Sequence, residues 1–210
     1  MKILAFDTSS NYLTVSLSKD NKILSSFHED VGLKHNEILM STINTVLVEA
    51  GLTIKDIDLI AVGIGPGSFT GLRIAAATAK GISAVLGTKI AAVPTFDIIA
   101  MNYIGKKIKK LTVVMDARKN KVYTASYDIS GEFPLKLTDC ILVEKEKIYF
   151  NENGVTFVGD ILDALDNDFC PKAINIARLG ENLFHNKRLI DPSELDPLYI
   201  YSKECSMTGK

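Results

Sequence analysis

Apolar and polar residues alternate over the first thirty positions as they do in a small antiparallel sheet. Residues 2–7 form a short apolar run that ends at Asp7. After a polar turn, residues 12–18 alternate between apolar and mostly hydroxyl-bearing side chains, which is the period of a half-buried strand. Asp20 and Asn21 then provide a hairpin turn into a third strand over residues 22–28. The pattern predicts three consecutive antiparallel strands.

The period then changes, and helices alternate with short buried strands. Helices are predicted over residues 36–50 and 70–86, and a third helix from 94 to about 103. Buried strands are predicted over residues 57–64 and 89–93. Three antiparallel strands followed by alternating helices and strands are typical of a ribonuclease-H-like half, in which helices cover both faces of a mixed sheet.

The second half of the chain restarts this pattern. Residues 111–116 form another apolar strand that ends in aspartate. Three residues of the first copy recur at a single offset in the second, as the pairs Asp7/Asp116, Asn11/Asn120 and Leu13/Val122. The copy is reduced, because only a strand at 155–158 and one clear helix at 173–185 follow. We therefore predict an α/β, actin-like (ASKHA) fold with two lobes, residues 1–105 and 106–210, of which the second is reduced.

A glycine-rich string joins the buried strand 57–64 to the following helix. It reads Gly63-Ile64-Gly65-Pro66-Gly67-Ser68-Phe69-Thr70-Gly71-Leu72-Arg73. Free N–H groups at a helix start, together with the helix dipole, provide an anion site, and glycines let a ligand or a backbone come close. A tight strand-to-helix turn without a ligand explains the same glycines, because short glycine motifs recur by chance. The glycine spacing alone leaves both interpretations open.

Asp7, Thr8 and Ser9 are a second candidate for phosphate binding. An aspartate at a strand end, followed by small hydroxyl residues, is how actin-like ATPases hold a metal-bound phosphate; the alternative is a turn residue that bonds its own backbone. The repeat copy lacks a glycine-rich hairpin, and no glycine-rich stretch for adenine follows late in the chain. We therefore expect a degraded nucleotide site with weak ATP or ADP binding at most. Its residual phosphate contacts would be Asp7, Thr8, Ser9, Gly65, Gly67, Ser68 and Thr70.

The two long predicted helices carry more apolar or small residues than one buried face needs. The apolar residues of helix 36–50 go nearly all the way round, so more than one face needs burial. Helix 70–86 is rich in alanine, with Ile74, Thr78 and Ile82 along one stripe, so a neighbouring helix could approach closely. Burial of each helix by its own sheet explains the same periodicity equally well.

Composition and charge argue against several other classes of protein. The 24 basic and 25 acidic residues give a net charge of −1, without the basic face that strong nucleic-acid binding requires. The lysine clusters near residues 106–110 and 118–121 are interpreted as solvated surface. Three dispersed cysteines and three histidines without helical spacing predict neither a disulfide scaffold nor a metal site. With no apolar stretch long enough for a signal peptide or a membrane span, we expect a cytoplasmic protein.

The glycine-rich string closely resembles the signature of the TsaB (YeaZ) family. Further segments that look like family elements are Leu4-Ala5-Phe6-Asp7-Thr8-Ser9, Asp116-Ala117-Arg118, Val122-Tyr123 and Pro197-Leu198-Tyr199-Ile200. The usual Tyr-Leu-Arg ending is Tyr199-Ile200-Tyr201 here. The resemblance covers most of the chain. It implies the non-catalytic partner in the bacterial machinery that places threonylcarbamoyl on adenosine 37 of tRNA.

The resemblance also implies partners and an interface. The catalytic subunit TsaD is the principal expected partner, the ATPase TsaE is a further one, and a homodimer is expected when the chain is alone. In TsaB the helices that correspond to residues 36–50 and 70–86 form a bundle with the partner's helices. The interface residues expected here are Leu39, Ile43, Val46, Leu47, Ile74, Ala75, Thr78 and Ile82.

The catalytic sister family, TsaD, carries two histidines four residues apart just after the strand equivalent to residues 89–93. This chain reads Val93-Pro94-Thr95-Phe96-Asp97 there, without histidine. We therefore expect no catalytic residue, no required cofactor and at most indirect or weak contact with tRNA. His35 resembles a His-Ser-Glu element of the family, and we expect it to cap a helix end or to pack at the surface.

A different class of function remains an alternative. The chain could be a free-standing nucleotide-dependent enzyme, such as a small-molecule kinase, that uses Asp7 for a metal and residues 65–71 for phosphate. Peptidase chemistry is not indicated, because neither an HExxH motif nor an evident Ser/His/Asp or Cys/His set is present in the sequence.

Overall fold

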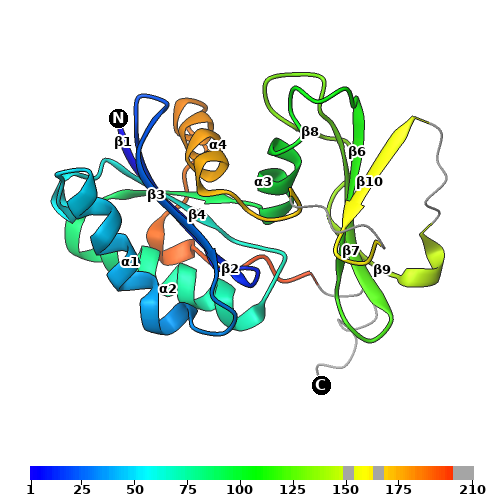
Figure 1. The fold of residues 1–210 in the computed structure, drawn as a ribbon, viewed down its shortest axis with the longest axis horizontal. Coiled ribbons are helices and arrows are strands. Elements are labelled where there is room, and N and C mark those ends of the chain that lie inside the picture. Colours follow the sequence, from blue (N-terminus) through cyan, green and yellow to red (C-terminus); the bar gives the residue numbers. More distant parts are fainter. Residues whose placement is uncertain (149–153, 163–167, 201–210) are drawn as a thin grey trace. The chain divides into compact units, whose positions relative to one another are not determined.

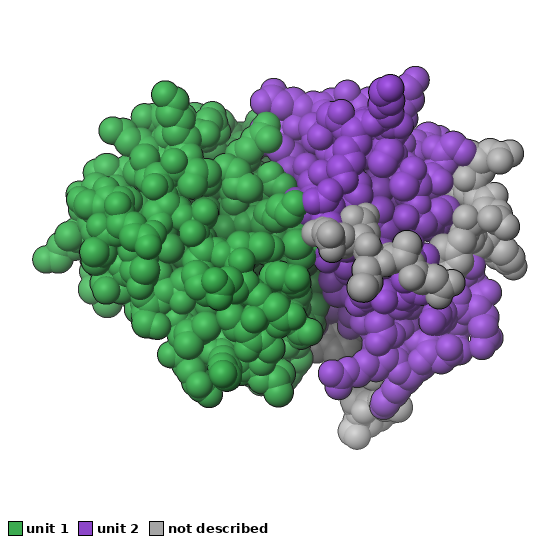
Figure 2. Space-filling view, viewed as in Figure 1, with its two compact units in different colours: residues 1–98, 170–198 green, residues 99–169, 199–210 purple. Residues whose placement is uncertain are grey.

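The computed structural model describes residues 1–148, 154–162 and 168–200, and it divides into two compact units (Figures 1 and 2). Unit 1 comprises residues 1–98 and 170–198, and unit 2 comprises residues 99–169 and 199–210. Within the described ranges, no helix is both long enough and apolar enough to cross a bilayer. The ending at Tyr201 that differs from the family pattern lies outside the described residues.

A five-stranded mixed sheet forms the centre of unit 1. In chain order its strands are β1 (Lys2–Asp7), β2 (Tyr12–Lys19), β3 (Lys22–Asp30), β4 (Leu59–Gly63) and β5 (Lys89–Val93). Their order in the sheet is β3-β2-β1-β4-β5, with β1, β2 and β3 antiparallel and with β4 and β5 parallel to β1. This is the ribonuclease-H-like topology that the sequence pattern predicts.

Helices cover both faces of this sheet. α1 (His35–Glu49) and α2 (Phe69–Leu86) pack against the face that presents Leu4, Phe6 and Val15. α4 (Ala173–His185) packs against the opposite face. Both faces of β1 and β4 are therefore buried, which explains why these strands are almost entirely apolar.

Unit 2 contains a second mixed sheet. Its strands are β6 (Lys110–Asp116), β7 (Lys121–Asp128), β8 (Leu135–Lys136), β9 (Ile141–Glu144) and β10 (Val155–Gly159). β6 pairs antiparallel with β7 and parallel with β10, just as β1 pairs antiparallel with β2 and parallel with β4. The repeat predicted from the sequence is thus present in the topology, and the fold is α/β and actin-like.

The remaining short elements in the described part of the chain are α3 (Thr95–Met101) and three 3₁₀ helices. α3 begins in unit 1 and ends in unit 2, and it is shorter than the helix to about residue 103 that the sequence predicts. Three single-turn 3₁₀ helices span Ile54–Asp56, Lys145–Lys147 and Pro192–Glu194.

The two compact units differ from the lobes predicted at 1–105 and 106–210. The main difference is α4, which the sequence places in the second lobe and the structure places in unit 1. α4 packs on the unit 1 sheet through Ala173, Ile176 and Ala177, which contact one face of β1, β4 and β5. The fit is close, because a Cβ added at Gly180 would stand 2.5 Å from the Cβ of Ala61. The chain leaves unit 1 within α3 and returns with α4, which covers the second face of the unit 1 sheet.

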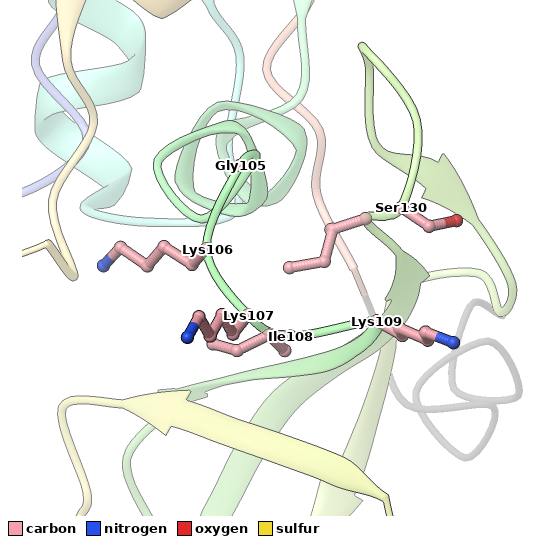
Figure 3. Close-up of a pocket in the computed structure, with 7 residues that line it drawn as sticks. Gly105, Lys106, Lys107, Ile108, Lys109 and Ser130 are labelled. Atoms are coloured by element: carbon pink, nitrogen blue, oxygen red, sulfur yellow. The ribbon is translucent and has the colours of Figure 1, made fainter.

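A hollow of about 370 Å³ opens in unit 2 just before β6 (Figure 3). Seven residues line it: Gly105, Lys106, Lys107, Ile108, Lys109, Ile129 and Ser130. The lysine cluster that the sequence assigned to solvated surface therefore surrounds a defined concave feature.

Candidate functional site

The carboxylate of Asp7 is enclosed at the carboxyl end of β1. Its side chain is fully buried. Asp7 Oδ1 accepts hydrogen bonds from the backbone N–H and the hydroxyl of Ser9, both at 2.6 Å. Burial raises the pKa of the Asp7 carboxyl above its ordinary value of 3.8, while the hydrogen bonds from Ser9 and Thr95 and the charge of His35 act in the opposite direction. Asp7 is therefore a turn residue that bonds its own backbone and is shielded from solvent.

The glycine-rich string folds directly onto the Asp7 turn. Ser68 N–H donates to the carbonyl oxygen of Ser9 at 2.7 Å, and the Thr8 hydroxyl donates to the carbonyl oxygen of Gly71 at 2.6 Å. A Cβ added at Gly71 would stand 1.8 Å from the carbonyl oxygen of Thr8, and one at Gly67 would stand 2.5 Å from that of Ser9. These glycines are needed because the two backbones are in direct contact at these positions.

A side chain is also excluded at Gly63 and Gly65, which precede Gly67 in the turn. A Cβ at Gly63 would lie 1.7 Å from Asp7 Oδ2. Gly65 has a φ of +108°, a conformation that favours glycine. Its N–H donates to the Thr95 hydroxyl oxygen at 3.1 Å, and its carbonyl oxygen accepts from Thr95 N–H at 2.8 Å. The start of α3 thus closes the turn.

Thr95 is the polar residue that links the three segments. Its hydroxyl lies 3.4 Å from Asp7 Oδ2 and 3.3 Å from Ser9 Oγ, and its side chain is fully buried. Thr95 was not among the residues predicted from the sequence. Its position immediately after Pro94, at the end of a buried parallel strand, was the available signal, because side chains at such strand ends converge on the site.

The structure brings the predicted phosphate-binding residues together but closes the space between them. Asp7, Thr8, Ser9 and Gly65 are buried, Gly67 is half-buried, and Ser68 and Thr70 are exposed. Ser68 Oγ caps α2 by accepting from Gly71 N–H at 3.3 Å. Of the two interpretations of the glycine string, the tight strand-to-helix turn accounts for this geometry.

His35 packs inside unit 1. It begins α1 and is buried, and its Nε2–H donates to the carbonyl oxygen of Tyr12 at 3.3 Å. The residue before it, Lys34, occupies the N-cap position without a side-chain cap. His35 therefore anchors the start of α1 to β2 by packing, and it neither caps the helix nor lies at the surface.

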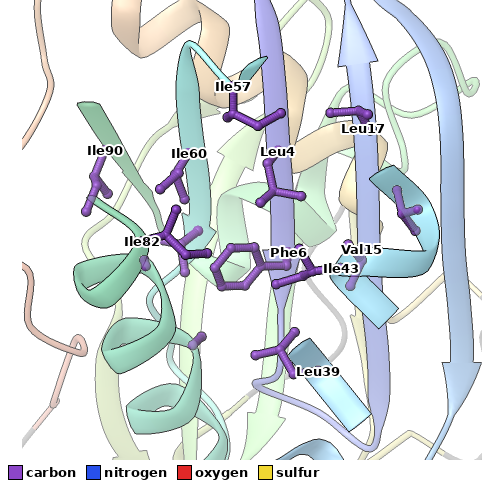
Figure 4. Packing of buried hydrophobic residues seen from close by; sticks show 14 of the residues in the cluster. Leu4, Phe6, Val15, Leu17, Leu39, Ile43, Ile57, Ile60, Ile82 and Ile90 are labelled. Atoms are coloured by element: carbon purple, nitrogen blue, oxygen red, sulfur yellow. The ribbon is translucent and has the colours of Figure 1, made fainter. Parts of the chain in front are cut away.

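The structure places most of the residues predicted for the helix interface in the core of unit 1. Six of the eight are buried in the core of unit 1, several of them visible in Figure 4: Leu39, Ile43, Val46, Leu47, Ala75 and Ile82. Ile74 and Thr78 are half-buried, and Ile74 packs against the same core. These side chains serve the helices' own sheet, which was the alternative that the periodicity left open.

A different set of residues forms what we call the outer face of α1 and α2. On α1, Met40 and Val48 are 57% and 66% exposed, and on α2, Val85 is 83% exposed. Exposed small residues continue this face along α2: Ala77, Gly81 and Ala84. The two helices therefore expose apolar and small side chains beside polar ones such as Asn44 and Thr45, at positions out of phase with the residues predicted from the sequence.

The equivalent turn in unit 2 is open and lacks a glycine string. Asp116 is exposed, and its N–H donates to Asp160 Oδ1 at 2.8 Å. Arg118, Lys119 and Asn120 all have left-handed backbone conformations. Burial raises the pKa of Asp160, and the nearby charge of Asp116 acts in the same direction. The repeat has kept the aspartate of the first copy, but Arg118 and Lys119 follow it where the first copy has Ser9 and Ser10.

One cysteine–histidine pair, which the sequence did not reveal, forms in unit 1. Cys170 Sγ lies 3.6 Å from His28 Nε2, and the His28 ring stacks on Tyr12 with centroids 4.8 Å apart. Burial lowers the pKa of His28, and the charge of Lys172 adds to this effect. Among the described residues, no three His, Cys, Asp or Glu side chains are grouped so that they could hold a metal ion.

Comparisons with known proteins connect this arrangement to one family. Residues 27–149 match the family model "TsaD: tRNA N6-adenosine threonylcarbamoyltransferase", which covers more than half of the chain. The "tRNA threonylcarbamoyladenosine biosynthesis protein TsaB" of Buchnera aphidicola subsp. Acyrthosiphon pisum is 30% identical over 165 residues, which are 75% of this chain and 74% of the relative. The chain belongs to the TsaB (YeaZ) family.

Further TsaB relatives agree with this assignment. The TsaB protein of Buchnera aphidicola subsp. Schizaphis graminum is 34% identical over 126 residues, which are 60% of both chains. The chain thus spans about three fifths of the length of this relative. YeaZ from Pseudomonas aeruginosa is 24% identical and shares the fold, with a TM-score of 0.84 over 95% of this chain and 99% of that chain. The family resemblance stated from the sequence motifs is confirmed.

Proposed function

We propose that this chain is a non-catalytic subunit of the system that forms threonylcarbamoyladenosine in tRNA, and that it acts in the cytosol. The observation that carries the proposal is its membership of the TsaB family, whose members are named for this pathway. The geometry around Asp7 is consistent with a supporting role. The one turn that resembles a phosphate site in unit 1 is occupied by the protein's own backbone.

The partner in this proposal is a TsaD-type catalytic subunit that binds the outer face of α1 and α2. Apolar side chains at Met40, Val48 and Val85 gain by leaving water, and the small residues of α2 allow close helix packing. In the absence of that partner, two copies of the chain would cover the same face in a two-fold homodimer, which is the commonest symmetry. The ATPase TsaE is a further partner in the proposal.

No cofactor is required in this proposal, and ATP or ADP would bind only weakly. Access of a phosphate to Asp7 would require the string from Gly63 to Gly71 to leave the Thr8–Ser9 backbone. That movement would break the hydrogen bonds from Ser68 to Ser9 and from Thr8 to Gly71. Contact with tRNA would be indirect or weak, because the net charge is −1.

Co-purification tests the proposal. The full chain, expressed with an affinity tag together with a TsaD homologue, should retain that homologue through size-exclusion chromatography. Isothermal titration should give a stoichiometry of one to one. Absence of any complex would contradict the proposed partnership. Tight ATP binding by the isolated chain, with turnover of a small-molecule acceptor, would instead support the kinase alternative.

A further inference from the structure

The hollow in unit 2 is the concave feature that the proposed function leaves unexplained. We call it the lysine hollow and define it by its lining residues, Gly105, Lys106, Lys107, Ile108, Lys109, Ile129 and Ser130 (Figure 3). It lies where the chain turns from the end of α3 into β6. Its volume of about 370 Å³ is in the range of sites that bind small molecules or single nucleotides.

The backbone that carries the lysines is held in place on both sides. Ile108 N–H donates to the carbonyl oxygen of Lys106 at 2.8 Å, and Ile129 N–H donates to the carbonyl oxygen of Lys109 at 2.9 Å. The Ile129 side chain is 2% exposed and Ile108 is half-buried, so both anchor the wall of the hollow. The lysine positions are thus fixed at the backbone.

Positive charge is in excess around the lysine hollow. Lys106 Nζ is paired with Asp168 Oδ2 at 2.5 Å and lies 4.2 Å from the centroid of the Tyr103 ring. Lys107 and Lys109 are exposed and form no ion pair within the described part of the chain.

One carboxylate near the lysine hollow is already engaged. Asp128 accepts hydrogen bonds from the hydroxyl and the backbone N–H of Ser130. These bonds lower the pKa of Asp128, and the charges of Lys110 and Lys109 contribute to a smaller extent. The carboxylate is therefore ionised at neutral pH and offsets part of the charge of Lys109 and Lys110. Lys107 is left as the cation most available to an external anion.

The directions of the lysine side chains indicate the kind of anion. In Figure 3 the ammonium groups of Lys106 and Lys107 extend to one side of the segment, whereas that of Lys109 extends to the opposite side. A single small anion could therefore not contact Lys107 and Lys109 at the same time. A polyanion whose charges repeat along a strand, about every 3.4 Å of helix axis in a nucleic acid, could contact both sides at once.

We propose that the lysine hollow binds the phosphate backbone of an RNA strand through Lys107 and Lys109. This inference rests on the proposed function, since the substrate of that pathway is a tRNA. The contact is electrostatic and independent of base sequence, because lysines on phosphates position a nucleic acid without reading it. Two lysine contacts make a weak site, so it would orient a tRNA that another subunit binds more tightly.

The test compares two charge-matched double variants of the full chain. The first is Lys107→Ala with Lys109→Ala. The control is Lys22→Ala with Lys55→Ala, which removes the same charge from exposed lysines of unit 1. Binding of a labelled RNA hairpin is followed by fluorescence anisotropy over a salt series starting at about 50 mM, where loss of phosphate contacts is largest. Circular dichroism and thermal unfolding verify that all proteins are folded.

The wild-type chain should bind the hairpin with a Kd near 10⁻⁴ to 10⁻⁵ M at physiological salt, on the order expected of non-specific contacts, and more tightly at low salt. The Lys107/Lys109 variant should bind roughly tenfold more weakly, and the slope of log K against log salt should fall by about 1.4–1.8, or ~0.7–0.9 per phosphate contact. The control variant should stay within about twofold of wild type, because its lysines lie outside the contacts that position the RNA.

Three results would overturn the inference. The first is that both double variants lose binding equally, or that the wild type does not bind the hairpin at all. In either case the complex with a TsaD homologue would still form, so the proposed function would stand while this inference fails. The second is binding of ATP as tight as that of the hairpin and equally sensitive to Lys107 and Lys109, which would assign the hollow to free nucleotides. The third is displacement of the hairpin by polyglutamate at the same charge concentration, which would assign it to an acidic protein.

Discussion

Gly71 and the carbonyl group of Thr8 illustrate how single atoms define the glycine-rich turn. Their contact leaves no room for a Cβ, since it would stand 1.8 Å from the carbonyl oxygen. The sequence alone indicated that a glycine was needed at this position. It could not show whether the glycine makes room for a ligand or for a second segment of backbone. Thr8 and Gly71 are 63 residues apart, so only the folded chain brings the carbonyl oxygen to the glycine.

Replacing Gly71 by alanine should therefore destabilise the fold. The added Cβ must displace the Thr8 backbone, which we expect to cost about 1–3 kcal/mol, as other overpacked sites do. Gly81 on the same helix is the matched control, because a Cβ there meets nothing within 4 Å. Gly81→Ala should leave stability unchanged or raise it by up to about 1 kcal/mol through helix propensity. Urea unfolding measures both, and equal stabilities would contradict the close backbone contact.

The buried Asp7 carboxyl should make stability depend on pH in a direction opposite to that of a salt-bridged aspartate. Because burial raises its pKa in the folded state above the ordinary 3.8, the folded protein holds this proton more tightly than the unfolded chain. The stabilisation is complete below the unfolded pKa and is lost as pH rises through the folded pKa.

Asp7→Asn isolates this effect, since asparagine keeps the acceptor for Ser9 and cannot ionise. The free energy of unfolding of wild type relative to Asp7→Asn should fall as pH is raised from below 3.8 to neutrality. Urea unfolding at a series of pH values gives this difference. If the wild type instead gains stability over the variant as pH rises across this range, the ionised carboxylate is the form that the fold stabilises. The interpretation that burial dominates the pKa of Asp7 would then be wrong.

At the scale of elements, periodicity placed most helices and strands within one or two residues of their observed bounds. It failed where the answer depends on which surface an element packs against. The nearly all-round apolar character of α1 hid which side faces the sheet, so core residues such as Ile43 were assigned to the interface. The same limit applies to α4, which has a clear helical pattern but no local signal that it packs on β1 and β4 of unit 1.

The outer face of α1 and α2 should be sensitive to charge without loss of the fold. Ala77→Glu places a carboxylate on an exposed small position of α2, where an apolar contact with a partner would leave it desolvated and unpaired. We expect the Kd for a TsaD homologue to rise by about tenfold or more, equivalent to ~1.4 kcal/mol. Ser26→Glu on the exposed side of β3 makes the same charge change away from this face and should bind normally.

Ile43→Lys should behave differently from Ala77→Glu, because its side chain is 2% exposed and lies in the core of unit 1. Burying an unpaired ammonium there should unfold the protein instead of weakening one contact. Circular dichroism separates the two outcomes. The contrary result has two parts: Ile43→Lys folds but does not bind the partner, and Ala77→Glu binds normally. The interface would then consist of the residues predicted from the sequence.

At the scale of the whole molecule, the fold class followed from the order of strands and helices, and the repeat was detectable from a few matched positions. The division into units could not be read in the same way, because residues 170–198 belong to unit 1 although they lie between the two segments of unit 2. The two copies of the repeat have diverged chemically. In unit 1 the strand-end aspartate is sealed by glycines and Thr95, whereas in unit 2 it is exposed beside Asp160.

In the proposed function this chain supports threonylcarbamoyl transfer to tRNA without performing it. Transfer of radiolabelled threonylcarbamoyl to tRNA should be measured with the chain alone, with a TsaD homologue and the ATPase alone, and with all three together. The account predicts no transfer by the chain alone and the highest rate when all three are present, with that increase lost in Ala77→Glu. Sustained transfer by the purified chain alone, at a rate that the partners do not change, would contradict it.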